Sequence, residues 1–421
     1  MDSAPPTKGK AAFEKLPIEV RHGVMSFLPD VNMRSMALSC RSFYDALKSG
    51  EPLITKRVLF KTIEDGVLLE AIAVLESSRL RSRTGRTISK FVAQHVELRG
   101  IPTPTWNLSN ALPISKIHSH VHHFAADFCS RSQETWPIDF GSTEISRVEV
   151  TRFERAFYRF ELYCSLFRHA GKPICSFDEQ KRIYFDKFPP WENEQLTCIH
   201  DYLFRAMSSD NVVYCNLHSS EAEIPSIQRP RDIEPILARG LSSIHSIIMA
   251  QTYEDRRNFL YPNYLLHSAD FLYEALKASN DAYNPDVDDY LHLWDYTEED
   301  KRLRIRSSFF DDDDYGLVGA WYWAHHREMW SRFVNSDSQR SLRECGYVFW
   351  NNARPDDVAM FQMEWMEPGQ PENDIDDDER RRRRASQDRR ISTRPVAEAG
   401  GVPKTRARSF GHRVVDSKAI V

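Results

Sequence analysis

Histidines crowd one short stretch of this 421-residue chain, and imidazole is the side chain that proteins use most often to bind metal ions. In the stretch IHSHVHHF, His118 and His122 are four residues apart, so a helix would place both on one face, as zinc can require. The HExxH pattern is absent, and no acidic ligand follows at the expected spacing. We therefore interpret His118 to His123 as a packed or solvated cluster and predict no metal ion. A metal-dependent enzyme that uses His118, His122 and His123 is kept as an alternative.

No other pattern of residues points to catalysis. The chain has neither a Walker A loop nor a GxGxxG loop for phosphates, and it lacks the GxSxG turn of serine hydrolases. No serine or cysteine nucleophile can be paired with a base from the sequence alone. We predict a protein that is not an enzyme, with no catalytic residue and no cofactor.

Composition restricts the partners and the compartment. The formal net charge is −5, which gives no overall case for nucleic-acid binding. The 7 cysteines are scattered and form no CxxC pair, which predicts reduced, mostly buried thiols. The first residues lack the apolar run of a signal peptide, and the richest apolar run, VLLEAIAVL, is too short to cross a membrane. We expect an intracellular protein of the cytoplasm or the nucleus, without a membrane partner.

The segments that would position functional side chains are predicted to be mainly α-helical. In the clearest segment, TRFERAFYRFELYCSLFRHAGKP, Thr151 and Glu154 have the spacing of a capping box at a helix N-terminus. Apolar residues then recur at helical spacing and predict a buried stripe: Phe153, Phe157, Phe160, Tyr163, Cys164 and Phe167. Three short β-prone runs, RVEVTRF, NVVYCNL and GYVFW, are too weak to predict a sheet.

The segment LPIEVRHGVMSFL has more apolar residues than one buried helix face needs. One face holds residues at i, i+4, i+7 and i+8, namely Val20, Val24, Phe27 and Leu28. Ile18 and Met25 lie on another side of the same helix. One face can pack against the chain's own core, so the other needs a different contact. Pro29 ends this helix, a second helix begins near Asn32, and a third begins at RSFYDAL.

This region resembles the F-box. The family pattern has a Leu-Pro opening, an acidic residue two positions on, an apolar helix that ends in leucine, and an LxxCRxW block. The matching residues are Leu16, Pro17, Glu19, Val20, Val24, Leu28, Met33, Leu38, Cys40, Arg41 and Leu47. Phe43 stands where the family often has tryptophan, and Ser39 replaces the usual apolar residue before the cysteine. Phe43 is still a large aromatic residue, so the packing role is kept.

In that family the module docks on the Skp adaptor of a cullin-RING ubiquitin ligase. The resemblance implies these adaptor-binding residues: Leu16, Pro17, Glu19, Val20, Val24, Leu28, Met33, Leu38, Cys40 and Phe43. A unit of roughly forty residues buries too little surface to be stable alone, so either a partner or the rest of the chain must cover the spare face. Three later blocks, RFERAFYRFELYCSLFR, WENEQLTCIHDYL and CGYVFWNNAR, more loosely resemble the helical bodies of filamentous-fungal F-box proteins.

We expect four parts: a disordered N-terminus over 1–11, a three-helix F-box over 12–56, a large helical body over 57–366, and a disordered charged tail over 367–421. The tail has too few apolar residues to offset the entropy of ordering it. Its arginine run is a candidate nuclear-import signal: Arg380, Arg381, Arg382, Arg383 and Arg384. Ser386 in RRAS and Ser392 in RRIS are candidate phosphorylation sites, because arginines two and three positions earlier suit an acidic kinase cleft.

The resemblance implies a substrate-recognition subunit of a Skp–cullin–F-box ubiquitin ligase, which presents a target protein for ubiquitination. The alternative is an F-box protein that binds the adaptor but acts outside degradation. No repeat module marks a face for the target protein, whose identity the sequence leaves open. Tryptophans at 321, 323, 330 and 350 would either line a receptor pocket or fill the core.

Overall fold

The computed structural model describes residues 15–28, 30–97, 105–135, 144–168, 173–208, 230–260, 271–279, 316–325, 334–335 and 339–351. Within these ranges the chain forms fifteen α-helices and no β-strand, which confirms the prediction of a mainly α protein. The chain divides into two compact units, Met1–Met366 and Glu367–Val421, and every described residue belongs to the first. The tail candidates Ser386, Ser392 and Arg380 to Arg384 lie outside the described residues.

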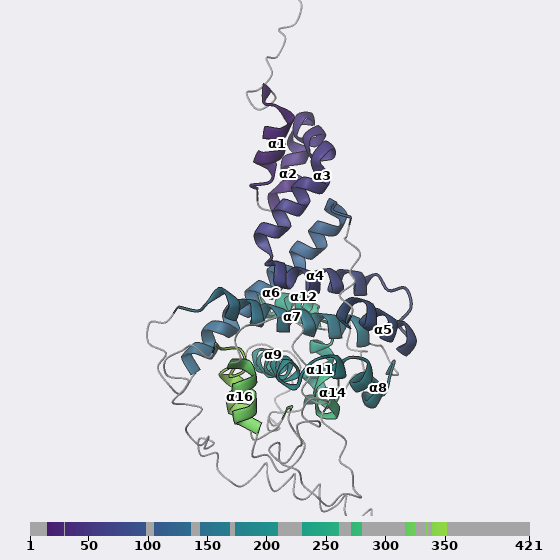
Figure 1. Cartoon of the computed structure of the whole chain (residues 1–421), viewed down its shortest axis with the longest axis vertical. Helices are drawn as coiled ribbons and strands as arrows, with labels where there is room; N and C mark the ends of the chain where they lie inside the picture. The colour runs from purple at the N-terminus through teal and green to yellow at the C-terminus, as the bar shows by residue number, and fades with distance from the viewer. Residues whose placement is uncertain are drawn as a thin grey trace, which may run out of the picture. The chain divides into compact units, whose positions relative to one another are not determined.

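Three helices open the described part of the chain, where three were predicted: α1 (Ile18–Met25), α2 (Asp30–Ser39) and α3 (Arg41–Thr62) (Figure 1). They enclose a small core of their own, made of Met25, Ala37, Ala46, Leu47, Ile54 and Val58. The helices α1 and α3 approach closely at Gly50, where an added Cβ would lie 2.7 Å from Nε2 of His22. A larger residue at this position would therefore require the imidazole ring of His22 to move.

The helix α3 links this small core to the rest of the fold. Ile54 and Val58 belong to the small core, whereas Leu59, one residue later, belongs to the large one. Glu51 of α3 also accepts a hydrogen bond at 2.8 Å from the backbone N–H of Leu108, the first residue of α6 (Leu108–Thr135). The first N–H groups of a helix lack partners within it, so this carboxylate caps α6. The expected boundary at residue 56 falls inside α3.

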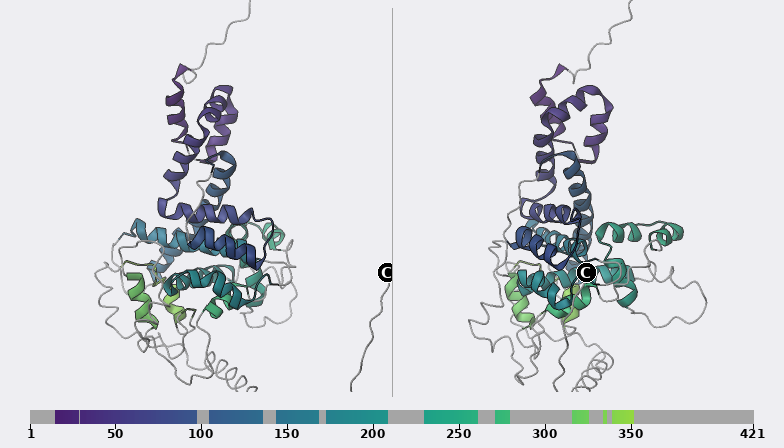
Figure 2. Two further views of the ribbon diagram at one scale, coloured as in Figure 1. Left: turned by 45° about the vertical axis from the view of Figure 1, so that its right-hand side comes forward. Right: turned by 90° about the vertical axis from the view of Figure 1, so that its right-hand side faces the viewer.

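The remaining helices form the body around one large core (Figure 2). They are α4 (Asp65–Ser78), α5 (Gly85–Val92), α7 (Arg147–Phe167), α8 (Phe177–Ile183), α9 (Pro190–Ser208), α11 (Pro230–Leu237), α12 (Leu241–Ile248), α13 (Tyr253–Leu260), α14 (Leu272–Ser279), α16 (Gly316–His325) and α17 (Arg340–Glu344). A π-helical turn, Ala93–Glu97, follows α5, and a short 3₁₀ turn, Phe185–Lys187, follows α8. The helix α7 packs against α4, α6 and α9 and is the central element of the body.

The helix α7 confirms the predicted buried stripe but not the predicted start. All six residues of the stripe are buried. The prediction that Thr151 and Glu154 form the capping box is wrong, because the N-cap of the helix is Ser146, five residues before Thr151. Ser146 caps it by accepting a hydrogen bond from the N–H of Glu149, and Glu149 accepts one from the N–H of Ser146. The β-prone run RVEVTRF is therefore helical, and GYVFW forms a buried turn, while NVVYCNL lies outside the described residues.

Several residues left open by the sequence prove to be core. Trp321, Trp323 and Trp350 are buried and belong to the large core, whereas Trp330 lies outside the described residues. The described cysteines are free thiols, and all but the half-buried Cys40 are buried, as predicted: Cys129, Cys164, Cys175, Cys198 and Cys345. The described tryptophans therefore stabilise the fold and offer no receptor pocket.

Candidate functional site

The helix α1 turns one side to the small core and another side to solvent. Met25 is completely buried, and Ile18 packs against the same core. On the other side Val20 is 45% exposed, Val24 is 38% exposed and Phe27 is 78% exposed. The two faces read from the sequence are therefore both present, and the face that includes Val20 and Val24 is the one left uncovered.

The next helix, α2, also carries an exposed apolar side chain. Leu38, near the end of α2, is 71% exposed, although leucine is usually buried. An apolar side chain left in water loses about 1.5–3 kcal/mol relative to full burial. We name Val20, Val24, Phe27 and Leu38 the N-terminal apolar face.

The predicted adaptor-binding residues whose side chains the structure describes fall into two groups by exposure. The exposed ones are Pro17, Glu19, Val20, Val24 and Leu38. The half-buried ones are Leu16, Leu28, Cys40 and Phe43. Phe43 packs against the small core, so its side chain supports the fold as well as the surface. The side chain of Met33 lies outside the described residues.

Phe27 is the exposed residue that the family pattern omitted. The ammonium group of Lys61, at the end of α3, lies 3.6 Å from the centroid of the Phe27 ring. A cation over an aromatic face is attracted by the ring quadrupole, so Lys61 holds the ring in place without covering it. The helical spacing in the sequence had already placed Phe27 on the same face as Val20 and Val24.

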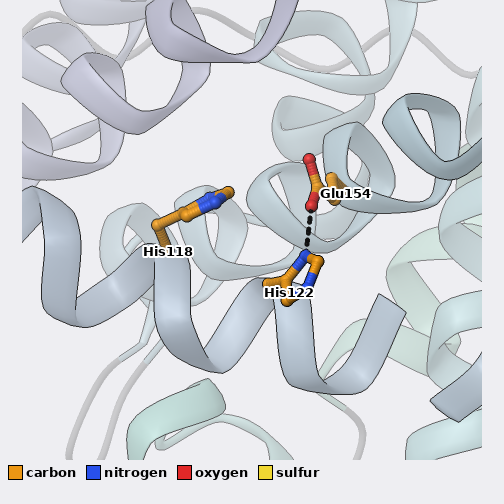
Figure 3. A group of neighbouring side chains, drawn as sticks. All are labelled: His118, His122 and Glu154. Carbon is orange, nitrogen blue, oxygen red and sulfur yellow. Dashed lines mark hydrogen bonds and ion pairs between the residues drawn. The ribbon is translucent and has the colours of Figure 1, made fainter. Parts of the chain in front are cut away.

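The histidines of α6 lie in two groups. His118 and His122 face α7, where the ligand atoms of His118, His122 and Glu154 all lie within 4.8 Å of one another (Figure 3). Nδ1 of His122 is 2.9 Å from Oε1 of Glu154, and Nδ1 of His118 is 3.1 Å from the hydroxyl of Tyr158. No acidic residue follows these histidines at ligand spacing in the sequence, but Glu154 reaches them from the neighbouring helix α7.

The other two histidines of α6 contact α12 instead. The ring centroids of His120 and His123 lie 4.6 Å and 4.8 Å from the ring of His245. Burial, with the nearby His245, Lys116 and His123, lowers the pKa of His120 to about 4. This half of the cluster is packed, as predicted. His123 is not part of the group formed by His118, His122 and Glu154, so the alternative ligand set that included it is not brought together.

A buried network of charged groups joins α9 to α11 and α17. Arg343 donates to Asp201 at 2.7 Å and lies 3.7 Å from Glu194, while Nε2 of His200 is 2.5 Å from Glu234. Burial alone would lower the pKa of His200, but the carboxylates of Glu234 and Asp201 outweigh it and raise that pKa to about 9. Each buried charge has an opposite partner, so the network serves to hold the helices together.

A further histidine, His325, packs in the same region of the core. His325 of α16 is buried, and its Nε2 is 2.9 Å from the hydroxyl of Tyr347. The same hydroxyl donates to Glu194 at 3.2 Å. His325 is therefore a core residue.

Two features thus stand out among the described residues. One is the N-terminal apolar face, and the other is the group of His118, His122 and Glu154 between α6 and α7. No helix within the described ranges combines the length and the hydropathy needed to span a bilayer. No family model, no curated protein and no solved structure matches the chain, so function has to be argued from these two sites.

Proposed function

We propose that this chain is an F-box substrate receptor of a Skp–cullin–F-box ubiquitin ligase. In this proposal α1, α2 and α3 bind the Skp adaptor, and the helical body binds a target protein. The observation that carries the proposal is the N-terminal apolar face, which lies on the helices that resemble the F-box and is left uncovered by the chain itself.

Burying this face against a partner would contribute part of the free energy of a complex. Burying one valine, leucine or phenylalanine side chain is worth about 1.5–3 kcal/mol. Association costs an estimated 4–15 kcal/mol in lost translational and rotational freedom. Its four partly exposed residues can act as the central anchors, with the half-buried Leu16 and Leu28 adding contact area around them.

The link between α3 and the body supports the same function. A receptor must hold its target at a fixed position relative to the conjugating enzyme, because catalysis arises from proximity alone. The helix α3 runs from the small core into the large one, and Glu51 ties it to the start of α6. The chain itself performs no chemistry in this proposal, and the assembled ligase acts in the cytoplasm or the nucleus.

The test is co-expression with the Skp adaptor followed by gel filtration. Wild type should elute with the adaptor as a one-to-one complex, and a Val20→Glu/Val24→Glu variant should elute alone. Because both valines point to solvent, this variant should keep the circular dichroism spectrum of wild type. A wild-type chain that elutes without the adaptor would contradict the proposal, and so would a double variant that still forms the complex.

The degradative role is tested separately from adaptor binding. A protein captured by the body in cells should turn over more slowly when the chain carries Val20→Glu/Val24→Glu. Unchanged turnover, with the adaptor complex lost, would favour an F-box protein that acts outside degradation.

A further inference from the structure

The helices α6 and α7 run antiparallel and form hydrogen bonds between their side chains. His118 meets Tyr158 and His122 meets Glu154, so the residue number rises on one helix as it falls on the other. A second, aromatic row of the same interface pairs Phe124 with Phe157 and Phe128 with Phe153, at centroid distances of 5.9 Å and 5.3 Å. Two polar contacts thus lie beside aromatic pairs in the interface of α6 and α7. The proposed adaptor-binding role requires neither of these polar contacts.

We propose that His118, His122 and Glu154 form a zinc-binding site between α6 and α7. Two imidazoles and one carboxylate are ligands that zinc accepts, and three protein ligands leave the fourth position to water. The proposal is independent of adaptor binding, since the N-terminal apolar face contributes no residue to this site.

The geometry needs only small adjustments to accept the ion. Zinc bonds to nitrogen and carboxylate oxygen of about 2.0–2.2 Å in a tetrahedron require ligand atoms about 3.3 Å apart. His122 and Glu154 are already closer than that, at 2.9 Å, and no pair in the group exceeds 4.8 Å. The side chain of His122 is 62% exposed, so it can rotate to open one pair and close the others.

Exposure of the three ligands suits binding from solution. His118 and Glu154 are each only 5% exposed and are fixed by the packing of α6 against α7. His122 is the exposed member and provides the path by which a hydrated ion enters. Two ligands held in place by packing reduce the entropy that the ion must overcome when it orders the third.

Tyr158 supplies the support that a ligating histidine usually has. Metal-bound imidazoles commonly form a hydrogen bond through the ring nitrogen that is not coordinated. The hydroxyl of Tyr158 lies 3.1 Å from Nδ1 of His118, and when this bond is kept, Nε2 is the coordinating nitrogen. Tyr158 is a positioning residue in this site, held by its complete burial.

The test uses the untagged full-length chain, stripped with a chelator and then titrated with zinc chloride by calorimetry. Wild type should bind one zinc ion at this site, and His122→Ala and Glu154→Gln should each weaken that binding at least tenfold. His123→Ala is the matched control, because it removes the next histidine on α6 without touching the site, and it should bind as wild type does. Tyr158→Phe should weaken binding by about 10–100-fold while all three ligands remain.

A spectroscopic readout separates coordination from a merely structural effect. Cobalt(II) chloride in place of zinc should give the intense visible absorption of a tetrahedral centre in wild type and in His123→Ala. His122→Ala changes an exposed side chain, so it should fold normally and lack these bands. The proposal is overturned if wild type binds no zinc, if His122→Ala retains full affinity, or if His123→Ala loses as much affinity as His122→Ala.

Discussion

Met25 and Val24 are neighbours in α1, about 100° apart around the helix axis, and they differ sharply in burial. Met25 has no exposed surface and anchors the small core, whereas Val24 is 38% exposed. The two residues therefore separate the contribution of α1 to folding from its contribution to binding. Substitution of Met25 should therefore reduce stability, whereas substitution of Val24 should reduce binding and leave stability nearly unchanged.

Met25→Ala should destabilise the three-helix part by about 2–5 kcal/mol, because it removes buried methylene groups and leaves a cavity. Val24→Ala should change the free energy of unfolding by less than about 0.5 kcal/mol, because its side chain is already partly in water. Hydrogen exchange of the α1 to α3 amides, compared between the two variants, measures this difference. Equal loss of protection in both would mean that Val24 also packs inward.

Gly240 should be intolerant of a side chain. Its φ of +87° lies in the left-handed region, and an added Cβ would lie 2.7 Å from Oε2 of Glu161. The same carboxylate accepts a hydrogen bond at 2.7 Å from the N–H of Leu241, at the start of α12. Gly240→Ala should therefore cost more than about 1 kcal/mol in urea unfolding.

The matched control for this glycine is Gly319 of α16. An added Cβ there would meet no atom within 4 Å, and the backbone is helical. Gly319→Ala should be neutral or should stabilise by about 0.5–1 kcal/mol, because alanine reduces the freedom of the unfolded chain. If Gly240→Ala were as stable as Gly319→Ala, the close approach of Glu161 would be disproved.

Stability should fall as the pH rises above neutrality, because of His200. Its pKa of about 9 in the folded chain exceeds the value near 6.5 expected when unfolded. Between these values the folded state binds a proton that the unfolded state has released, so the stabilisation is complete below pH 6.5 and is lost as pH rises through 9. We expect the free energy of unfolding to fall by about 2 kcal/mol from pH 6.5 to 8, measured by urea titrations at each pH.

The variant His200→Gln tests the origin of that slope. At pH 6.5 it should be less stable than wild type by about 3–5 kcal/mol, since the buried carboxylate of Glu234 loses its charged partner, and this difference should shrink by about 2 kcal/mol at pH 8. It should also lose the decline between pH 6.5 and 8, because glutamine does not titrate. A decline of the same size in the variant would assign the pH dependence to other groups.

The helices that could be predicted from the sequence are those whose apolar residues repeat with a strong period. The stripe from Phe153 to Phe167 identified α7, and the prolines and the cysteine–arginine block separated α1, α2 and α3. The start of α7 could not be chosen correctly, because Ser146 with Glu149 and Thr151 with Glu154 have the same capping-box spacing. Only the fold shows that Glu154 is engaged by His122 and is not available for capping.

Sites built from distant parts of the chain could not be predicted in the same way. Glu154 lies 32 positions from His122 in the sequence, and Arg343 lies 142 positions from Asp201. A periodic pattern carries no information about which helices will be neighbours, so these partners appear only once the helices have packed. Val20, Val24 and Phe27 could be predicted as one exposed apolar face because they lie within eight consecutive residues and repeat at helical spacing.

The affinity of the purified chain for the Skp adaptor, measured by calorimetry, is the most direct test of the proposed receptor function. Val20 is 45% exposed on α1 and Val148 is 51% exposed on α7, so Val20→Glu and Val148→Glu introduce the same charge at similar exposure. We expect tight binding by wild type and by Val148→Glu, and at least a hundredfold weaker binding by Val20→Glu. Equal affinities for the two variants, or no binding by wild type, would contradict the assignment of the N-terminal apolar face to the adaptor.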